Sequence, residues 1–395
     1  MNLKASTLLR PAVIGVLIGA FACSGVNAQS YPKAAPPASI PTFSTENIAR
    51  EGFFFAGGHY VGPPDKQVMG GAMYTEVLVP KVIKHPYPIV FMPVGGFSGI
   101  EFLQTPDGRP GWARWFVDQG YVVYTVDPPG RGRSPWVPDV DGEQDTIRTA
   151  QTAEKQWTDP EHLAGWPQAK KFTQWPGTTG HRGDPVFDTL ANYEITYIRK
   201  NFEDLSQPAG VALLDMIGPA IIMAHAQNTG TAWLMADSRP KLVKGIIALQ
   251  ASGPPLQNVD TGNGNFTYRG AGRVWGVTFN PIHYDPPIKD PSELKVELQD
   301  KPEAPDLVPC WRQKEPARKL INLIGIPVVV VSSEAGYHRP YDHCTAEWLN
   351  QAGVKTEFVG LEKVGLRGND DLEPLEKNSI EIAKYLASWI EKNVH

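Results

Sequence analysis

Five short apolar runs constrain the fold of this chain more than any other feature. Each run ends where polar or glycine residues begin, and the segments between runs are long enough for helices that connect one strand to the next. Runs of this kind are typical of strands buried on both faces of a parallel sheet. They are residues 88–92, 121–126, 220–225, 245–249 and 327–331, with a weaker sixth at 356–359. The pattern predicts an α/β protein with a mostly parallel central sheet.

The elements around this sheet can also be read from the sequence. The alternating residues at 72–80 predict an antiparallel strand at the sheet edge. Helices are expected at 111–119, 231–237, 344–352 and 379–393, and the last of these is amphipathic and would close the domain.

Two long regions interrupt this alternation, at about 135–216 and 253–320. Ligands of open α/β sheets bind beyond the carboxyl ends of the strands, and both regions leave the sheet from that side. We therefore expect them to form a cap over a ligand site. Trp157, Trp166 and Trp175 are candidate walls of this site, although tryptophans in a large insertion more commonly form a small core of their own.

The amino terminus has the features of an export signal. Basic residues precede an apolar stretch at 11–25, which is short for a bilayer span, and small residues precede Gln29 as at a cleavage site. The expected organisation is a signal peptide at 1–28, a flexible leader at 29–45 and an α/β domain at 46–395. The mature protein would be periplasmic or secreted, without membrane contact after cleavage.

The net charge bears on possible partners, and the cysteine content bears on a possible disulfide. The net charge is -5 over 395 residues and the basic residues are scattered, so no nucleic-acid partner is expected. Cys310 and Cys344 remain after signal removal, and two such thiols commonly pair in an oxidising compartment. The alternative is two buried free cysteines, because spacing alone does not fix the distance between their Cα atoms.

Distinctive motifs follow the expected strands and helices along nearly the whole mature chain. They are 105–112 (TPDGRPGW), 120–124 (GYVVY), 127–134 (DPPGRGRS), 237–245 (DSRPKLVKG), 252–255 (SGPP), 337–344 (YHRPYDHC) and 375–378 (LEKN). Together they resemble the bacterial esterase 713-like branch of the α/β hydrolases. The resemblance implies the α/β-hydrolase fold, with cap insertions, in an exported relative of carboxylic ester hydrolases.

The resemblance places a catalytic triad at three positions that are changed in this chain. Ala226 stands at the turn where the fold lifts a serine hydroxyl above the sheet, and Asn228 replaces a glycine of that turn. Gln250 stands at the glutamate position, and Asp371 stands at the histidine position. A serine needs an imidazole to take its proton, and the imidazole needs a carboxylate to orient it. A methyl group, a neutral amide and an acid do not supply these functions.

The loop that would hold an oxyanion is only partly retained. Gly95, Gly96 and Gln227 offer backbone N–H groups that could point at an oxyanion, but Val94 replaces the histidine of the usual His-Gly turn. These residues are candidates for the lining of a binding pocket.

Other residues could carry chemistry in place of the triad. Asp127 and Glu334 each follow a strand and are the alternative acids, with local backbone contacts as the competing interpretation. His225 should point away from residue 226, because successive strand residues face opposite sides of a sheet. His338, His343 and Asp342 of motif 337–344, taken with Glu334, match no zinc-binding spacing, so a structural role is expected for them, and no metal and no cofactor is expected.

Two functions follow as hypotheses. The first is an esterase-like protein that has lost serine-esterase catalysis and binds a small molecule, either an ester or a carboxylate, or regulates a partner. The alternative is an enzyme that uses the same pocket for acid/base chemistry, or for weak ester hydrolysis by oxyanion donors alone. Converging carboxylates with raised pKa values would favour the alternative. The sequence leaves the oligomeric state open.

Overall fold

A computed structural model describes residues 36, 37, 39–163, 165–261 and 266–395 of the chain. The expected signal peptide at 1–28 and part of the leader at 29–45 lie outside the described residues. Residues 43–395 form one compact unit, and the described residues before it contain no helix or strand.

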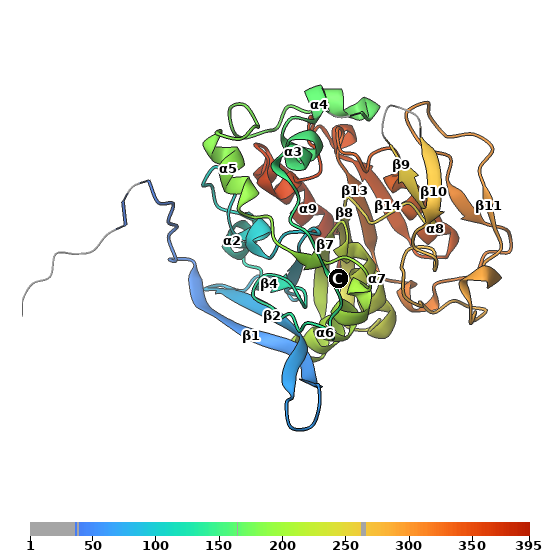
Figure 1. The fold of residues 1–395 in the computed structure, drawn as a ribbon, viewed down its shortest axis with the longest axis horizontal. Helices are drawn as coiled ribbons and strands as arrows, with labels where there is room; N and C mark the ends of the chain where they lie inside the picture. The colour runs from blue at the N-terminus through green and yellow to red at the C-terminus, as the bar shows by residue number, and fades with distance from the viewer. Residues whose placement is uncertain (1–35, 38, 164, 262–265) are drawn as a thin grey trace, which may run out of the picture. The chain divides into compact units, whose positions relative to one another are not determined.

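An eight-stranded sheet forms the centre of this unit, in the order β1-β2-β4-β3-β7-β8-β13-β14 (Figure 1). The strands are β1 (Ile48–Val61), β2 (Val68–Pro80), β3 (Ile89–Met92), β4 (Val123–Asp127), β7 (Ala220–His225), β8 (Val243–Leu249), β13 (Val328–Ser332) and β14 (Thr356–Gly360). The six from β4 to β14 run parallel, while β2 is antiparallel to both β4 and β1. The predicted mostly parallel sheet is therefore confirmed.

The edge of the sheet differs from the prediction. The alternating segment 72–80 lies in β2, which is antiparallel as expected, but β1 pairs along its outer side. The strand expected at the edge is thus the second strand, and β1 occupies the edge.

Helices cover both faces of the sheet. They are α1 (Ile100–Leu103), α2 (Trp112–Asp118), α3 (Ala150–Ala153), α4 (Pro160–Leu163), α5 (Pro185–Ala191), α6 (Phe202–Ile217), α7 (Asn228–Ser238), α8 (Asp342–Gln351) and α9 (Ser379–Asn393). Residues of α6, α7 and α8 share one core cluster with Ile222 of β7, whereas residues of α2 and α9 share another with Ile221. Neighbouring residues of β7 thus face opposite helical layers, as strand geometry requires.

The two regions expected to form a cap contain short elements outside the main sheet. The first holds α3, α4, α5 and the strand pair β5 (Gln144–Asp145) and β6 (Tyr197–Ile198), and the second holds two small antiparallel pairs. Those pairs are β9 (Gln257–Asp260) with β10 (Thr267–Ala271), and β11 (Val296–Leu298) with β12 (Trp311–Gln313). The last part of the range 135–216 belongs to α6, which packs against β1 and α7. α6 is therefore one of the helices that cover the main sheet and is not part of a cap.

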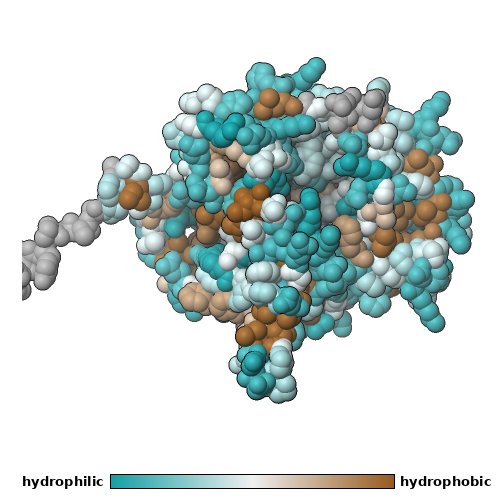
Figure 2. All heavy atoms as spheres, viewed as in Figure 1, coloured by the Kyte–Doolittle hydropathy of each residue, from teal (hydrophilic) through white to brown (hydrophobic). Residues whose placement is uncertain are grey.

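Exposed apolar residues also occur on the hairpin formed by β1 and β2. β1 and β2 form a projecting hairpin with exposed Phe53, Tyr60 and Val68, and Figure 2 shows apolar residues gathered near its tip. Within the described part of the chain, no helix combines the length and apolar character needed to cross a bilayer.

Candidate functional site

The turn between β7 and α7 keeps the backbone of a nucleophile elbow. Ala226 has φ of 44°, a left-handed conformation that is uncommon for a residue other than glycine. Its amide donates to the Leu249 carbonyl at 2.9 Å, and its carbonyl accepts from the Thr229 amide at 3.0 Å. Asn228 fits the turn, because its side-chain amide donates to the Pro93 carbonyl. The turn is therefore strained at Ala226, the residue predicted from the sequence to occupy the nucleophile position.

Gln250 and Asp371, the other two positions of the expected triad, are both fully buried. Gln250 also has a positive φ, of 45°, and its Nε2 donates to Glu373 Oε1 at 2.6 Å. Asp371 accepts from the Trp157 indole at 3.0 Å, and its other oxygen lies 3.7 Å from His338 Nε2. Neither Gln250 nor Asp371 lines the cavity. Gln250 contacts Glu373, and Asp371 approaches His338, instead of the cavity.

A second polar chain runs behind the elbow and was not anticipated from the sequence. Glu101 accepts from the Val94 amide at 2.7 Å and contacts His225 Nδ1 at 2.5 Å, while His225 Nε2 lies 3.9 Å from Glu373. Burial alone would lower the pKa of His225, but the charges of Glu101 and Glu373 raise it to about 9. Burial raises the pKa of Glu373 to about 7. His225 does not line the cavity, in agreement with the expected alternation along β7.

The loop after β3 supplies only part of the expected oxyanion site. Gly95 and Gln227 line the cavity, but Gly96 does not. Arg131 connects this loop to the turn between β7 and α7, since it donates to the Val94 carbonyl at 3.0 Å and to Gln227 Oε1 at 2.6 Å. The backbone around an oxyanion position is thus held firmly by a buried guanidinium.

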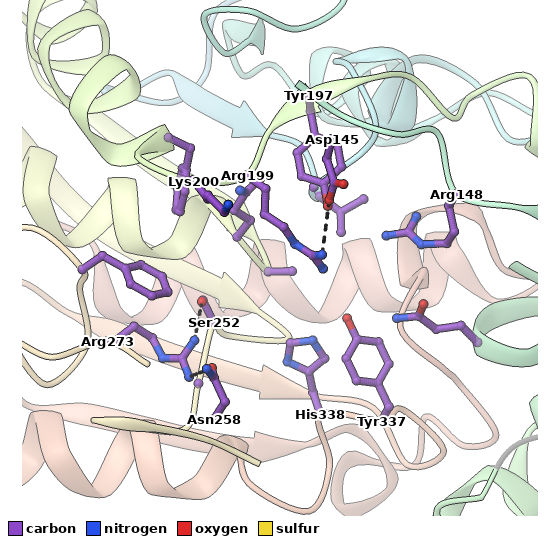
Figure 3. Close-up of a pocket in the computed structure, with 18 of the residues that line it drawn as sticks. Asp145, Arg148, Tyr197, Arg199, Lys200, Ser252, Asn258, Arg273, Tyr337 and His338 are labelled. Atoms are coloured by element: carbon purple, nitrogen blue, oxygen red, sulfur yellow. Dashed lines mark hydrogen bonds and ion pairs between the residues drawn. The ribbon is translucent and has the colours of Figure 1, made fainter. Parts of the chain in front are cut away.

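His338 is the imidazole that faces the cavity. Its Nδ1 lies 3.1 Å from the Ala251 carbonyl and 3.4 Å from Asp342, and Asp371 lies beyond its Nε2. Burial opposes its protonation, yet the charges of Asp371 and Asp342 raise the pKa of His338 above the ordinary 6.5. Figure 3 shows the His338 and Tyr337 rings side by side in the pocket. The sequence had assigned this histidine a structural role, and its place in the cavity gives it access to a ligand.

The two alternative acids, Asp127 and Glu334, both form hydrogen bonds and ion pairs outside the cavity. Asp127 accepts from the Gly99 amide at 2.7 Å and pairs with Arg133 at 2.9 Å. Burial of Glu334 opposes its ionisation, but its pairing with Arg367 at 2.9 Å helps to keep its pKa below the ordinary value. Neither acid lines the cavity, so the backbone and ion-pair interpretation accounts for both.

The three tryptophans proposed as walls of the site, Trp157, Trp166 and Trp175, do not line the cavity. Trp157 and Trp166 are buried, and Trp157 packs in a small cluster with Phe97. Trp175 is partly buried and packs against the same cluster. Trp157 and Trp175 belong to a small core, which was the more common of the two expected arrangements, whereas Trp166 donates to the Ala335 carbonyl and packs against Tyr337.

Cys310 and Cys344 form a disulfide with a Cα–Cα distance of 5.2 Å, so the predicted pairing is confirmed. His343 lies next to this bridge, but the two sulfurs are bonded to each other and are not free thiolates. A second group of possible metal ligands among the described residues comprises Asp159, Glu161 and His162 around α4. Neither group lines the cavity.

The cavity above Ala226 has a volume of about 1030 Å³ and is bordered by both cap regions. That volume is at the upper end of the range for small-molecule sites. Five basic residues and two acids line it: Arg148, Arg199, Lys200, Arg269 and Arg273, with Asp145 and Glu203. Figure 3 shows several of these side chains around the same space as His338.

Comparisons with known proteins agree with this architecture. No protein-family model matches the chain. The chain is 41% identical over 346 residues to the "Probable secreted lipase phiG" of a fungal species (strain ATCC 74256), covering 86% of this chain and 89% of that protein. The solved structure titled "The Atomic Resolution Structure of a Novel Bacterial Esterase" matches with a TM-score of 0.56 and 18% identity. That match covers 92% of this chain and all of the esterase chain, and it supports the fold alone. Identity to the fungal protein and the shared fold show that the chain belongs to the esterase-like family of α/β hydrolases.

Proposed function

We propose that this protein is an exported α/β hydrolase that has lost serine-esterase catalysis and uses its cavity to bind a small molecule. The observation that carries the proposal is Ala226, whose methyl group lines the cavity from a nucleophile elbow. The motifs of the esterase 713-like branch support treating Ala226, Gln250 and Asp371 as substituted triad positions. Export is supported by the signal-like amino terminus and by the name of the secreted fungal relative.

Nearby hydroxyl groups are poor replacements for the missing nucleophile. Thr229 donates its hydroxyl to the Ala226 carbonyl at 2.8 Å and accepts from the Ser252 amide at 2.8 Å. The Ser252 hydroxyl lies 3.4 Å from Arg273, a guanidinium that cannot accept a proton. A serine is activated by a base within hydrogen-bond reach, and neither contact provides one.

A second candidate function is proton transfer, and the position of His338 favours it. This imidazole lines the cavity, and Asp342 and Asp371 flank its two nitrogens. A histidine held in this way can give or take a proton at a ligand, as isomerisation and elimination require. Acid/base chemistry would then depend on His338, with Asp371 as its buried partner.

Hydrolysis of 4-nitrophenyl acetate, butyrate and octanoate tests the main proposal. The mature protein should release no nitrophenol above an equal concentration of its Ala226→Gly variant, which also lacks a hydroxyl. Ala226→Ser alone should remain nearly inactive, because the triad acts as a unit. Combining it with Gln250→Glu and Asp371→His should give measurable hydrolysis. Saturable turnover by the unmodified protein would overturn the proposal.

The second candidate has its own measurement. Proton transfer would exchange α-hydrogens of small keto acids in D2O, followed by proton NMR. Exchange that is lost in His338→Asn and retained in Ala226→Gly would favour enzyme chemistry over binding. If neither the unmodified protein nor Ala226→Gly exchanges α-hydrogens faster than buffer alone, this second candidate function is removed.

A further inference from the structure

We propose that the cavity selects an organic anion with a carboxylate group, and that Arg273 is its main charged contact. The inference rests on the proposed function, since it names the ligand class of the same cavity. It is carried by the charge of the lining and by the unusual environment of one buried arginine.

The charge of the cavity is opposite to that of the whole protein. The chain carries a net charge of -5, yet five basic residues and only two acids line this space. When charges of one sign line a cleft whose walls have a low dielectric constant, the electrostatic field in the cleft is strengthened. The local concentration of oppositely charged ligands rises as a result. A cavity for a neutral ester would have no need of this excess of basic side chains.

Three of the five basic side chains already have a carboxylate partner. Arg148 pairs with Glu194 at 2.6 Å, Arg199 pairs with Asp145 at 3.2 Å, and Arg269 pairs with Asp260 at 3.3 Å. These ion pairs reduce the charge that each guanidinium can offer to a ligand. Their role in the cavity is therefore secondary.

Of the other two, Lys200 is exposed, whereas Arg273 is buried and its hydrogen bonds go only to neutral oxygens. It donates to the Pro254 carbonyl at 2.9 Å, to Asn258 Oδ1 at 3.2 Å and to Ser252 Oγ at 3.4 Å. Within the described ranges, no carboxylate lies within ion-pair distance of it, although the charge of Glu203 in the same cavity acts on it from farther away, and only 5% of the residue is exposed. A buried charge without an ion-pair partner is unfavourable. A bound carboxylate would compensate it through a charge-assisted hydrogen bond from Nη1, whose other contact is the long one to Ser252, because Nη2 already donates to Gln257 and Asn258.

The ligand would extend from Arg273 toward the elbow. Arg273, His338 and Ala226 all line the cavity, and Figure 3 shows the Arg273 and His338 side chains at the same space. The volume of about 1030 Å³ accommodates a molecule much larger than acetate. We therefore expect a medium-sized carboxylic acid, with its apolar part over Ala226.

Calorimetry with 4-phenylbutyrate and its methyl ester, at low ionic strength, tests the inference. The carboxylate should bind at least tenfold more tightly than the ester, and added salt should weaken only the carboxylate. Arg273→Gln should lose at least tenfold in carboxylate affinity. Arg239→Gln removes a surface guanidinium paired with Asp215 outside the cavity, so it should bind as the unmodified protein does.

A second variant keeps the test decisive if Arg273→Gln does not fold. Asn258→Asp would place a carboxylate beside the intact guanidinium and should weaken carboxylate binding to a similar extent. Equal binding of acid and ester, or normal carboxylate binding by folded Arg273→Gln or Asn258→Asp, would overturn the inference. Hydrolysis of the methyl ester is a separate readout, and it would contradict the proposed function instead.

Discussion

Replacing Glu373 by glutamine tests the buried proton network beneath the cavity. Glutamine keeps the shape of the side chain and an oxygen that can accept from Gln250 and Ser333, as Oε1 of the glutamate does. It removes only the ability to ionise. The change therefore separates the charge of this side chain from its packing.

The size of the effect follows from the pKa of Glu373, which burial raises from 4.5 to about 7. Because the folded pKa lies above the unfolded one, the carboxyl stabilises the fold when it is protonated. This contribution is complete below about pH 4.5 and is lost as the pH rises through 7. It corresponds to roughly 3 kcal/mol in the free energy of unfolding.

Urea unfolding at pH 5, 6, 7 and 8 measures this dependence. The unmodified protein should lose roughly 3 kcal/mol more than Glu373→Gln between pH 5 and pH 8. The raised pKa of His225 acts in the same direction, and because Glu373 contributes to it, Glu373→Gln removes that share of the dependence as well. Glu297→Gln, at an exposed position of β11, should keep the original dependence. Parallel curves for Glu373→Gln and the unmodified protein would refute the reasoning.

Two further predictions concern contacts outside the elbow. The bond between Cys310 and Cys344 closes a segment with a sequence separation of 34, so Cys344→Ser should lower the free energy of unfolding by about 4 kcal/mol, measured by urea unfolding without reductant. An unchanged midpoint would contradict this estimate. Trp157→Phe would remove the indole donor to buried Asp371 and should cost about 2 kcal/mol in the same assay, whereas Trp115→Phe, a partly buried site on α2, should cost less.

The sheet could be predicted because strands that are buried on both faces of a parallel sheet have continuous apolar sequences. The run at 220–225 coincides with β7, and the amphipathic segment 379–393 coincides with α9. β1 was missed because Gly52, Gly57 and Gly58 interrupt its apolar residues and most of its side chains are exposed. α6 was missed because Pro208 lies inside it, and an internal proline usually ends a helix.

The site was only partly predictable, for a different reason. The elbow position could be found because a buried strand and a helix flank Ala226 closely in sequence. The contact of His225 with Glu101 joins residues that are 124 positions apart in the sequence. Neither residue lies in a sequence motif that would have indicated the contact. The cavity position of His338 also depends on tertiary folding, since Asp371 approaches it from a separate segment. Only the folded chain brings such groups together.

Reaction of the folded mature protein with a fluorophosphonate, followed by intact mass and peptide mapping, tests the loss of the nucleophile most directly. The account predicts no adduct, because the elbow presents a methyl group at Ala226. The variant that combines Ala226→Ser, Gln250→Glu and Asp371→His is the positive control and should be labelled at residue 226. A stoichiometric adduct on the unmodified protein, at Ser98, Thr229 or Ser252, would show that a nucleophile persists and would contradict the account.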